Sequence, residues 1–231
     1  MRLHKTGHPI ADTVSDLIGE VPDGEYAIAY GILRHDLFHR TGRYFEVDKG
    51  FWGAGHYNGS YRISFNGTQP QYTEDGPREP HGLKLDPMRR REGYTMILPP
   101  TEHVCKFFNI DYAAWLMEAV KNAGSMRYIR NKGTSVRDIE WDDISKVITF
   151  NSTLGIEAIR RGIQVISDPV HSTVGSFTAQ KGPIDYHSRE ELLSFCASHQ
   201  FKLDEKEKIC SLIRHYLCSS AGTQEKQSSA M

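Results

Sequence analysis

The stretch VITFNSTLGIEAIRRGIQVIS, residues 147–167, decides the fold of this chain. Its first four residues, 147–150, form a short apolar run that predicts a buried strand. A helix is expected from Leu154 to Arg161, because Gly162 stands where helices commonly end. Residues 163–167 predict a second buried strand. A strand, a helix and a strand joined by short connections indicate a parallel crossover unit.

The same alternation recurs on both sides of this stretch. Apolar runs predict further strands, and apolar residues at helical spacing, together with capping residues, predict further helices. The expected strands are 26–30, 43–48, 94–98 and 126–130, and the expected helices are 31–40, 111–123, 188–198 and 206–217. Such a pattern is typical of open, doubly wound sheets. It predicts an α/β protein with two small Rossmann-like halves, each built on a parallel sheet.

The boundary between the two halves is expected in a segment rich in proline and charge. Residues 71–92 contain Pro77, Pro80 and Pro87 and have the composition of a linker. The predicted domains are therefore an N-terminal α/β domain over residues 1–92, with a loop-rich insert, and a C-terminal α/β domain over residues 93–218. The polar residues 219–231 are expected to form a disordered tail.

Composition narrows the class of protein. The 231 residues are 39% hydrophobic and 25% charged, which is a globular balance. No apolar run reaches the roughly 20 residues of a membrane span, and no signal-peptide stretch is seen, so we expect a cytoplasmic protein. The net charge of −1 does not by itself indicate a nucleic-acid partner. The basic stretch 84–91 is expected to be a solvated loop or a contact for phosphates.

The turn after the strand 147–150 is the expected binding site. In doubly wound sheets, ligands collect at the carboxyl ends of the strands, and anions are held where a helix begins. Asn151, Ser152 and Thr153 would offer hydroxyl groups and free backbone N–H groups to a diphosphate, and Gly155 would allow close backbone approach. The alternative is that Ser152 only caps its helix.

Residues 148–166 resemble the donor-binding signature of capsular-polysaccharide transferases of the Kdo-transferase type, which are two-domain GT-B glycosyltransferases. In that family a proline loop follows the next strand, which Asp168-Pro169 matches. The segment 127–132 resembles the family's basic strand, so Arg130 and Lys132 would neutralise the phosphates of the donor. Across roughly residues 25–200 the chain also resembles short phage-encoded glycosyltransferase-like proteins.

The resemblance implies two GT-B-like halves facing a cleft. It implies transfer of a sugar from a UDP-, GDP- or CMP-linked donor to a hydroxyl group of a glycan or of a hydroxymethylated DNA base, without an obligatory metal or other cofactor. Two other hypotheses stay open. The chain could be a non-catalytic module that binds nucleotides or sugar phosphates, or a phosphoester hydrolase that uses the histidines of its first domain.

An inverting transferase needs a base to deprotonate the acceptor. Asp48, at the end of a strand, is the first choice and His56 the second, although Asp48 could cap its own loop and His56 could serve in packing or contact the donor. Arg62 would bind acceptor or phosphate, or be solvated. His35 and His39 share a helical spacing, but no glutamate of a metal-binding motif accompanies them, so no metal is predicted.

Three further residues complete the expected site. Glu157, one turn into its helix, could accept hydrogen bonds from ribose hydroxyls or be a solvated side chain. Glu102 and His103 belong to the turn Pro-Pro-Thr-Glu-His, which would either shape the substrate cleft or be purely structural.

Overall fold

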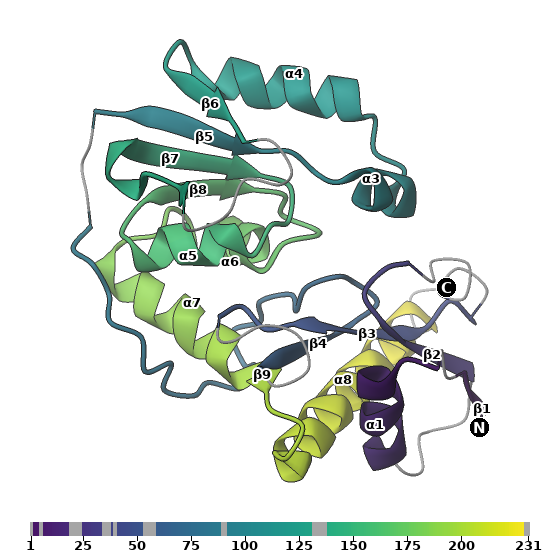
Figure 1. Cartoon of the computed structure of the whole chain (residues 1–231). Coiled ribbons are helices and arrows are strands. Elements are labelled where there is room, and N and C mark those ends of the chain that lie inside the picture. The colour runs from purple at the N-terminus through teal and green to yellow at the C-terminus, as the bar shows by residue number, and fades with distance from the viewer. Residues whose placement is uncertain are drawn as a thin grey trace. The chain divides into compact units, whose positions relative to one another are not determined.

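The computed structural model describes residues 2–4, 7–18, 25–33, 38, 41–52, 59–88, 92–130 and 138–228 (Figure 1). The chain divides into two compact units. Unit 1 combines Met1–Gly67 with His199–Met231, and unit 2 is Thr68–Ser198. No helix in the described ranges is both long and apolar enough to cross a membrane.

Unit 2 contains a four-stranded sheet in which every neighbouring pair is parallel, in the order β6-β5-β7-β8. The strands are β5 (Tyr94–Leu98), β6 (Arg127–Ile129), β7 (Ile144–Thr149) and β8 (Gln164–Ser167). The helices are α3 (Glu102–Phe108), α4 (Tyr112–Ala123), α5 (Leu154–Arg160), α6 (Thr173–Lys181) and α7 (Tyr186–Ser198), and a short 3-10 helix, η2 (Trp141–Asp143), precedes β7. Figure 1 shows α4 on one side of this sheet and α5 and α6 on the other. The predicted parallel α/β architecture is confirmed for this unit.

Helix α4 illustrates how local sequence sets an element. Asp111 caps it, with Oδ1 accepting hydrogen bonds from Ala113 N at 2.9 Å and Ala114 N at 3.1 Å. Gly124 ends the helix with a φ of 78°, which a side chain would disfavour. Ala119 packs against the sheet, whereas Met117 is 69% exposed.

Residues 68–88 pack into unit 2, although a linker was predicted over 71–92. The ring of Tyr72 is 1% exposed and lies 4.6 Å from that of Phe177 and 5.3 Å from that of Phe195. The buried Arg189 donates from Nη1 to Asp86 O at 2.7 Å. Prolines prevent a helix here, but an extended segment can still bury its side chains. The division at Gly67 and Thr68 consequently differs from the predicted boundary after residue 92.

Unit 1 contains a mixed five-stranded sheet in the order β1-β2-β3-β4-β9. The strands are β1 (Arg2–His4), β2 (Glu25–Tyr30), β3 (Tyr44–Lys49), β4 (Tyr61–Phe65) and β9 (Gln200–Phe201). The expected parallel pairing holds for β2 and β3, and β1, which was not predicted, also pairs parallel with β2, but β4 and β9 pair antiparallel. The prediction of a wholly parallel sheet is wrong here, because only the 11 residues 50–60 connect β3 to β4, fewer than the dozen or more that a parallel crossover requires.

Helices α1 (Pro9–Ile18) and α8 (Lys206–Ser228) complete unit 1. The core joins both helices to the sheet, and its buried members include Ile10, Val14, Ile28, Phe45, Ile63, Phe201, Ile209, Leu212 and Ile213. Helix α8 continues to Ser228, whereas disorder was predicted from residue 219. Alanine, glutamine, glutamate and lysine in this stretch favour a helix. Most of the helix predicted over 31–40 lies outside the described residues.

Candidate functional site

A cavity of about 430 Å³ opens at the carboxyl ends of β5, β6 and β7 in unit 2. Its apolar lining consists of Leu98, Pro99, Pro100, Val104, Tyr112 and Ile129, and its polar lining of Thr101, Glu102, Arg130, Thr149, Asn151 and Ser152. The carboxyl edge of a parallel sheet is where ligands of doubly wound proteins bind. The volume lies within the range of about 300–1,000 Å³ that is usual for small-molecule sites.

Arg130 reaches the cavity because it directly follows β6. Its backbone N–H donates to Ile97 O at 3.0 Å, which extends the parallel ladder by one residue. The side chain is half-buried in the lining. A guanidinium in such a place presents several donors to a phosphate or carboxylate and stays charged.

The turn after β7 is held by its own hydrogen bonds. Ser152 N donates to Thr149 Oγ1 at 3.1 Å, and Ser152 Oγ accepts from Leu154 N at 3.3 Å. Ser152 thus binds the first N–H group of α5 with its hydroxyl, although Thr153 holds the N-cap position, and the predicted free N–H group at Ser152 is wrong. Thr153 makes no side-chain cap hydrogen bond and is not in the described lining. Asn151 and Ser152 do line the cavity.

Asn151 is fixed by a segment that the sequence did not connect with it. Its Nδ2 donates to Thr68 Oγ1 at 2.9 Å, and its backbone carbonyl accepts from Gln69 Nε2. Thr68 and Gln69 are buried. They precede Asn151 by about 80 residues and match no motif, so no local signal could have revealed this contact.

Glu157 is engaged by its own helix. Its carboxylate accepts from Arg160 Nη2 and from Arg161 Nε, each at 2.7 Å. Burial raises the pKa of Glu157, but the hydrogen bonds and charges of both arginines outweigh burial and hold this pKa below its ordinary value. Arg161 in turn lies over the ring of Trp141, 5.0 Å from its centroid. These contacts favour a structural role over the predicted contact with ribose.

Glu102 and His103 stand in the first turn of α3. Thr101 caps this helix by accepting from Val104 N at 3.3 Å. Glu102 lines the cavity and pairs with Lys106 at 2.7 Å, and its side chain is 76% exposed. His103 is exposed and, among the described residues, does not belong to the lining.

His171 is a further polar residue at the carboxyl end of this sheet that no expectation singled out. It follows β8, and its ring stacks on that of Phe108 with centroids 4.2 Å apart. Asp168 Oδ1 accepts from Val170 N and His171 N, at 2.9 and 2.8 Å, and so shapes the loop. The predicted proline loop Asp168-Pro169 was the signal that pointed to this place.

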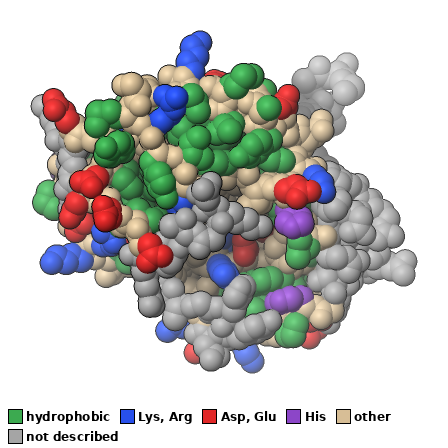
Figure 2. Space-filling model, turned by 45° about the horizontal axis from the view of Figure 1, so that its top comes forward, with side chains coloured by type: hydrophobic (Ala, Val, Ile, Leu, Met, Phe, Trp, Pro, Cys, Tyr) green, Lys and Arg blue, Asp and Glu red, His purple; other side chains and the backbone are tan. Residues whose placement is uncertain are grey.

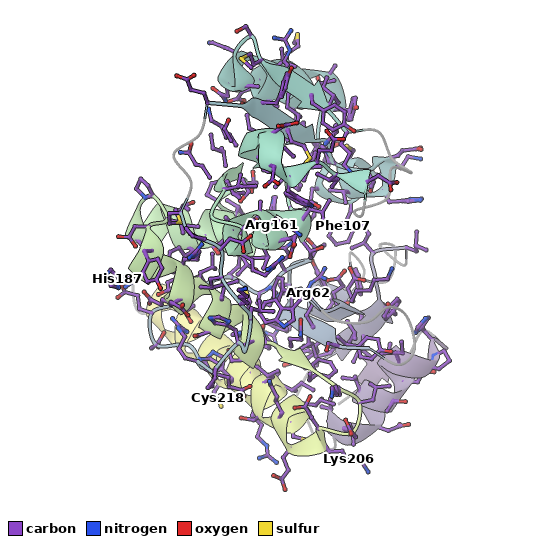
Figure 3. All side chains as sticks on the ribbon, turned by 60° about the vertical axis from the view of Figure 1, so that its left-hand side comes forward. Arg62, Phe107, Arg161, His187, Lys206 and Cys218 are labelled. Atoms are coloured by element: carbon purple, nitrogen blue, oxygen red, sulfur yellow. The ribbon has the colours of Figure 1, made fainter. Side chains whose placement is uncertain are left out.

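Asp48 and Arg62, expected to have separate roles, form an ion pair in unit 1. They are register partners on the antiparallel strands β3 and β4, and Arg62 Nη2 lies 2.9 Å from Asp48 Oδ2. Asp48 Oδ1 accepts from Lys49 N at 2.7 Å. The Arg62 side chain, which is labelled in Figure 3, is 6% exposed and lies over the ring of Phe51, so the alternative of a solvated Arg62 is wrong.

Glu46 is a buried carboxyl group beside this ion pair. Burial raises its pKa well above the ordinary value, and the charge of Asp48 raises it further, while Arg62 and a hydrogen bond from Ser64 act in the opposite direction. Ser64 Oγ donates to Glu46 Oε2 at 3.3 Å. Sequence patterns do not single out Glu46, because it occupies an ordinary strand position.

The remaining expectations fall partly outside the described residues. This applies to His56, Lys132, His35 and His39, and to the arginines of the basic stretch 84–91. Lys84, from the same stretch, is exposed. Within the part of the chain that the structure describes, no group of three or more histidine, cysteine or acidic side chains could hold a metal ion.

A second cavity, of about 400 Å³, lies at the amino ends of the same strands of unit 2. It is lined by Tyr94, Arg127, Tyr128, Asp138, Ile139, Glu140, Asp143 and Ile144. Figure 2 shows hydrophobic side chains gathered on one face of the molecule with acidic side chains beside them. The exposed apolar residues of unit 2 include Met117, Met126 and Tyr128. Arg127 lies at the amino end of β6 and lines this second cavity, whereas Arg130 follows the carboxyl end of β6 and lines the first. Substitutions of the two arginines can therefore be compared.

The structure thus brings together Arg130, Asn151, Ser152 and Glu102 around one cavity, and it places Asp48 and Arg62 in unit 1. The sequence matches no protein-family model and no curated protein.

Proposed function

We propose that this protein is a cytoplasmic glycosyltransferase that moves a sugar from a nucleotide-sugar donor to a hydroxyl group. The observation that supports the proposal is the cavity at the carboxyl edge of the parallel sheet, where Arg130, Asn151 and Ser152 face an apolar wall. In this proposal unit 2 binds the UDP-, GDP- or CMP-linked donor and unit 1 serves the acceptor, as the two halves of a GT-B-like enzyme. The acceptor is a glycan or a hydroxymethylated DNA base, as in the phage-encoded proteins that the sequence resembles.

The two kinds of lining suit the two ends of a nucleotide. Pro100, Tyr112 and Ile129 offer apolar surface for a base, and Arg130 offers a positive charge for a phosphate. When the bond between sugar and phosphate breaks, negative charge grows on the departing phosphate. A fixed guanidinium stabilises that charge without reorganising. Lys132 would add a second positive charge, so the reaction would need no obligatory metal.

Arg130→Met tests the binding of the donor. We expect it to weaken binding of the nucleotide about 10- to 100-fold, because a hydrogen bond to a charged group contributes about 1.5–3 kcal/mol. Arg127→Met is the matched control, since Arg127 lies at the other end of β6 and donates to Gly124 O. Calorimetric titration with UDP, GDP and CMP measures both variants. Equal affinity in the two variants would contradict the proposed site.

The proposed base is Asp48, with His56 as the second choice. Arg62 holds the Asp48 carboxylate in one orientation, and the Asp48 side chain remains 33% exposed. Asp48→Asn is expected to abolish transfer of the sugar while leaving nucleotide affinity unchanged, because Asp48 belongs to unit 1 and the donor cavity to unit 2. The rate of transfer is measured from the release of the free nucleotide from the nucleotide sugar.

A second candidate is a non-catalytic module that binds nucleotides. This candidate is favoured by the contacts of Asp48, because both of its carboxylate oxygens already accept hydrogen bonds. The two functions differ in turnover. Binding of nucleotide sugars without their hydrolysis or transfer, in a protein whose Asp48→Asn variant behaves identically, would support the module.

A further inference from the structure

Gln69 joins two loops at the carboxyl edge of the sheet in unit 2. Its Nε2 donates to the backbone carbonyl of Asn151, and its Oε1 accepts from Thr173 N at 3.0 Å. Asn151 belongs to the loop after β7, and Thr173 is the first residue of α6, which follows β8. One side-chain amide therefore bridges the loops that follow two neighbouring strands.

The residues on either side of Gln69 reinforce this bridge. Thr68 Oγ1 accepts from Asn151 Nδ2 at 2.9 Å, and Thr173 Oγ1 donates to Pro70 O at 2.6 Å. Thr68, Gln69 and Thr173 are at most 5% exposed. Water cannot readily replace these hydrogen bonds, so losing the Gln69 amide would leave a buried carbonyl and a buried N–H group without partners.

We propose that Gln69 is a positioning residue for the nucleotide cavity. By holding the Asn151 carbonyl, it sets the orientation of the loop that carries Asn151 and Ser152 before any ligand arrives. Binding of a nucleoside diphosphate then need not order this loop, and preorganisation of this kind raises affinity. The ligand named here rests on the proposed function, whereas the ordering of the two loops does not depend on it.

Amide hydrogen exchange tests the ordering directly, in the full-length protein without ligand. Gln69→Ala is expected to accelerate exchange about tenfold or more at Thr173, whose N–H it exposes, and in residues 151–154. Gln69→Glu keeps the acceptor for Thr173 N but loses the donor to Asn151, so exchange should rise in residues 151–154 and stay slow at Thr173. Gln71→Ala is the matched control, because Gln71 is an exposed glutamine in the same segment, and its Nε2 makes a long hydrogen bond of 3.5 Å to Gln69 O. Unchanged exchange in Gln69→Ala would overturn the proposal.

Calorimetric titration with UDP, GDP and CMP tests the effect on the cavity. Gln69→Ala is expected to raise the Kd of the bound nucleotide about tenfold, and Gln71→Ala to leave it unchanged. Ile144→Val, at the opposite end of β7, controls for lost stability because Ile144 is buried away from this cavity. If Gln69→Ala weakens binding no more than Ile144→Val does, Gln69 is structural and the positioning role is overturned. If the unaltered protein binds none of the nucleotides, the proposed function and the ligand fall, and the exchange rates still decide whether Gln69 orders both loops.

Discussion

Glu46 is a carboxyl group buried in the sheet of unit 1, and its protonation is linked to stability. Its pKa is raised chiefly by burial and also by Asp48, despite the opposing effects of Arg62 and Ser64. The folded protein therefore holds this proton more tightly than the unfolded chain does. As a result, Glu46 contributes stability at low pH that is lost as the pH rises from the ordinary value of about 4.5 through the raised pKa.

Glu46→Gln should remove this pH dependence, because glutamine keeps the shape of the side chain and cannot ionise. We expect the variant's free energy of unfolding to fall less than that of the unaltered protein as the pH rises from 4.5, as measured by urea unfolding across the pH range. Glu157→Gln is a control of opposite sign, since the lowered pKa of Glu157 contributes stability that is lost as the pH falls through that pKa. Identical slopes for Glu46→Gln and the unaltered protein would contradict the assignment.

Single residues of the candidate site were predictable where they directly follow a strand. Asn151 comes just after the apolar run 147–150, and the carboxyl ends of parallel strands meet at one edge, so sequence order placed it there. Arg130 was expected within the strand 126–130, and its role came only from the resemblance to a basic strand. The roles of backbone groups were not predictable in this way. Whether the Ser152 N–H is free depends on the rotamer of Thr149, which brings its hydroxyl within 3.1 Å.

Among the elements, those with strong local signals were found and those defined by distant partners were missed. The helix α4 has both a capping aspartate and a terminal glycine, and β7 is an apolar run. The strand β4 pairs with β9 across more than 130 residues, through the partners Tyr61 and Phe201 and the partners Arg62 and Gln200. No short window of sequence contains that information, so the pairing of β4 with β9 could not be predicted.

The start of α6 lies close to the backbone of the loop that follows β8. A Cβ atom at Gly175 would lie 2.0 Å from Asp168 O, whereas one at Gly155 would lie 3.4 Å from Val165 Cγ1, which is an ordinary contact. Gly175→Ala should therefore destabilise unit 2 by about 1–3 kcal/mol or more, because the backbone must shift. Gly155→Ala should be neutral or stabilise the helix by up to about 1 kcal/mol.

Urea unfolding of the two glycine variants, followed by a signal from unit 2, makes this comparison. Similar midpoints for Gly175→Ala and Gly155→Ala would show that the loop 167–168 yields easily to a side chain on α6. Such a result would also weaken the view that α6 and its neighbouring loops are rigidly packed.

At the scale of the molecule, unit 2 is one continuous segment, whereas unit 1 consists of two separated ones. The core of unit 1 packs Ile10 and Val14 of α1 and the sheet together with Ile209, Leu212 and Ile213 of α8. This arrangement was not predicted, because the proline-rich composition of residues 71–92 resembles that of a linker. A high proline content predicts that a segment is not helical, but it does not predict whether a side chain such as Tyr72 is buried.

A fragment of residues 68–198 should accordingly fold by itself, since its sheet, helices and extended segment lie within one stretch of chain. Residues 1–67 alone should not fold, because they lack β9 and the apolar side chains of α8. Circular dichroism and the cooperativity of thermal unfolding check both fragments. A cooperative transition of residues 1–67 would show that the sheet of unit 1 tolerates the loss of its last strand.

The pairing of β4 with β9 has a consequence for biosynthesis. A ribosome adds about 5–20 residues per second, so β4 emerges on the order of ten seconds before β9 exists. During that interval the nascent chain carries a strand edge with unsatisfied backbone groups, which is prone to mispairing with other chains. Slow codons after residue 198 would prolong this period of vulnerability to aggregation.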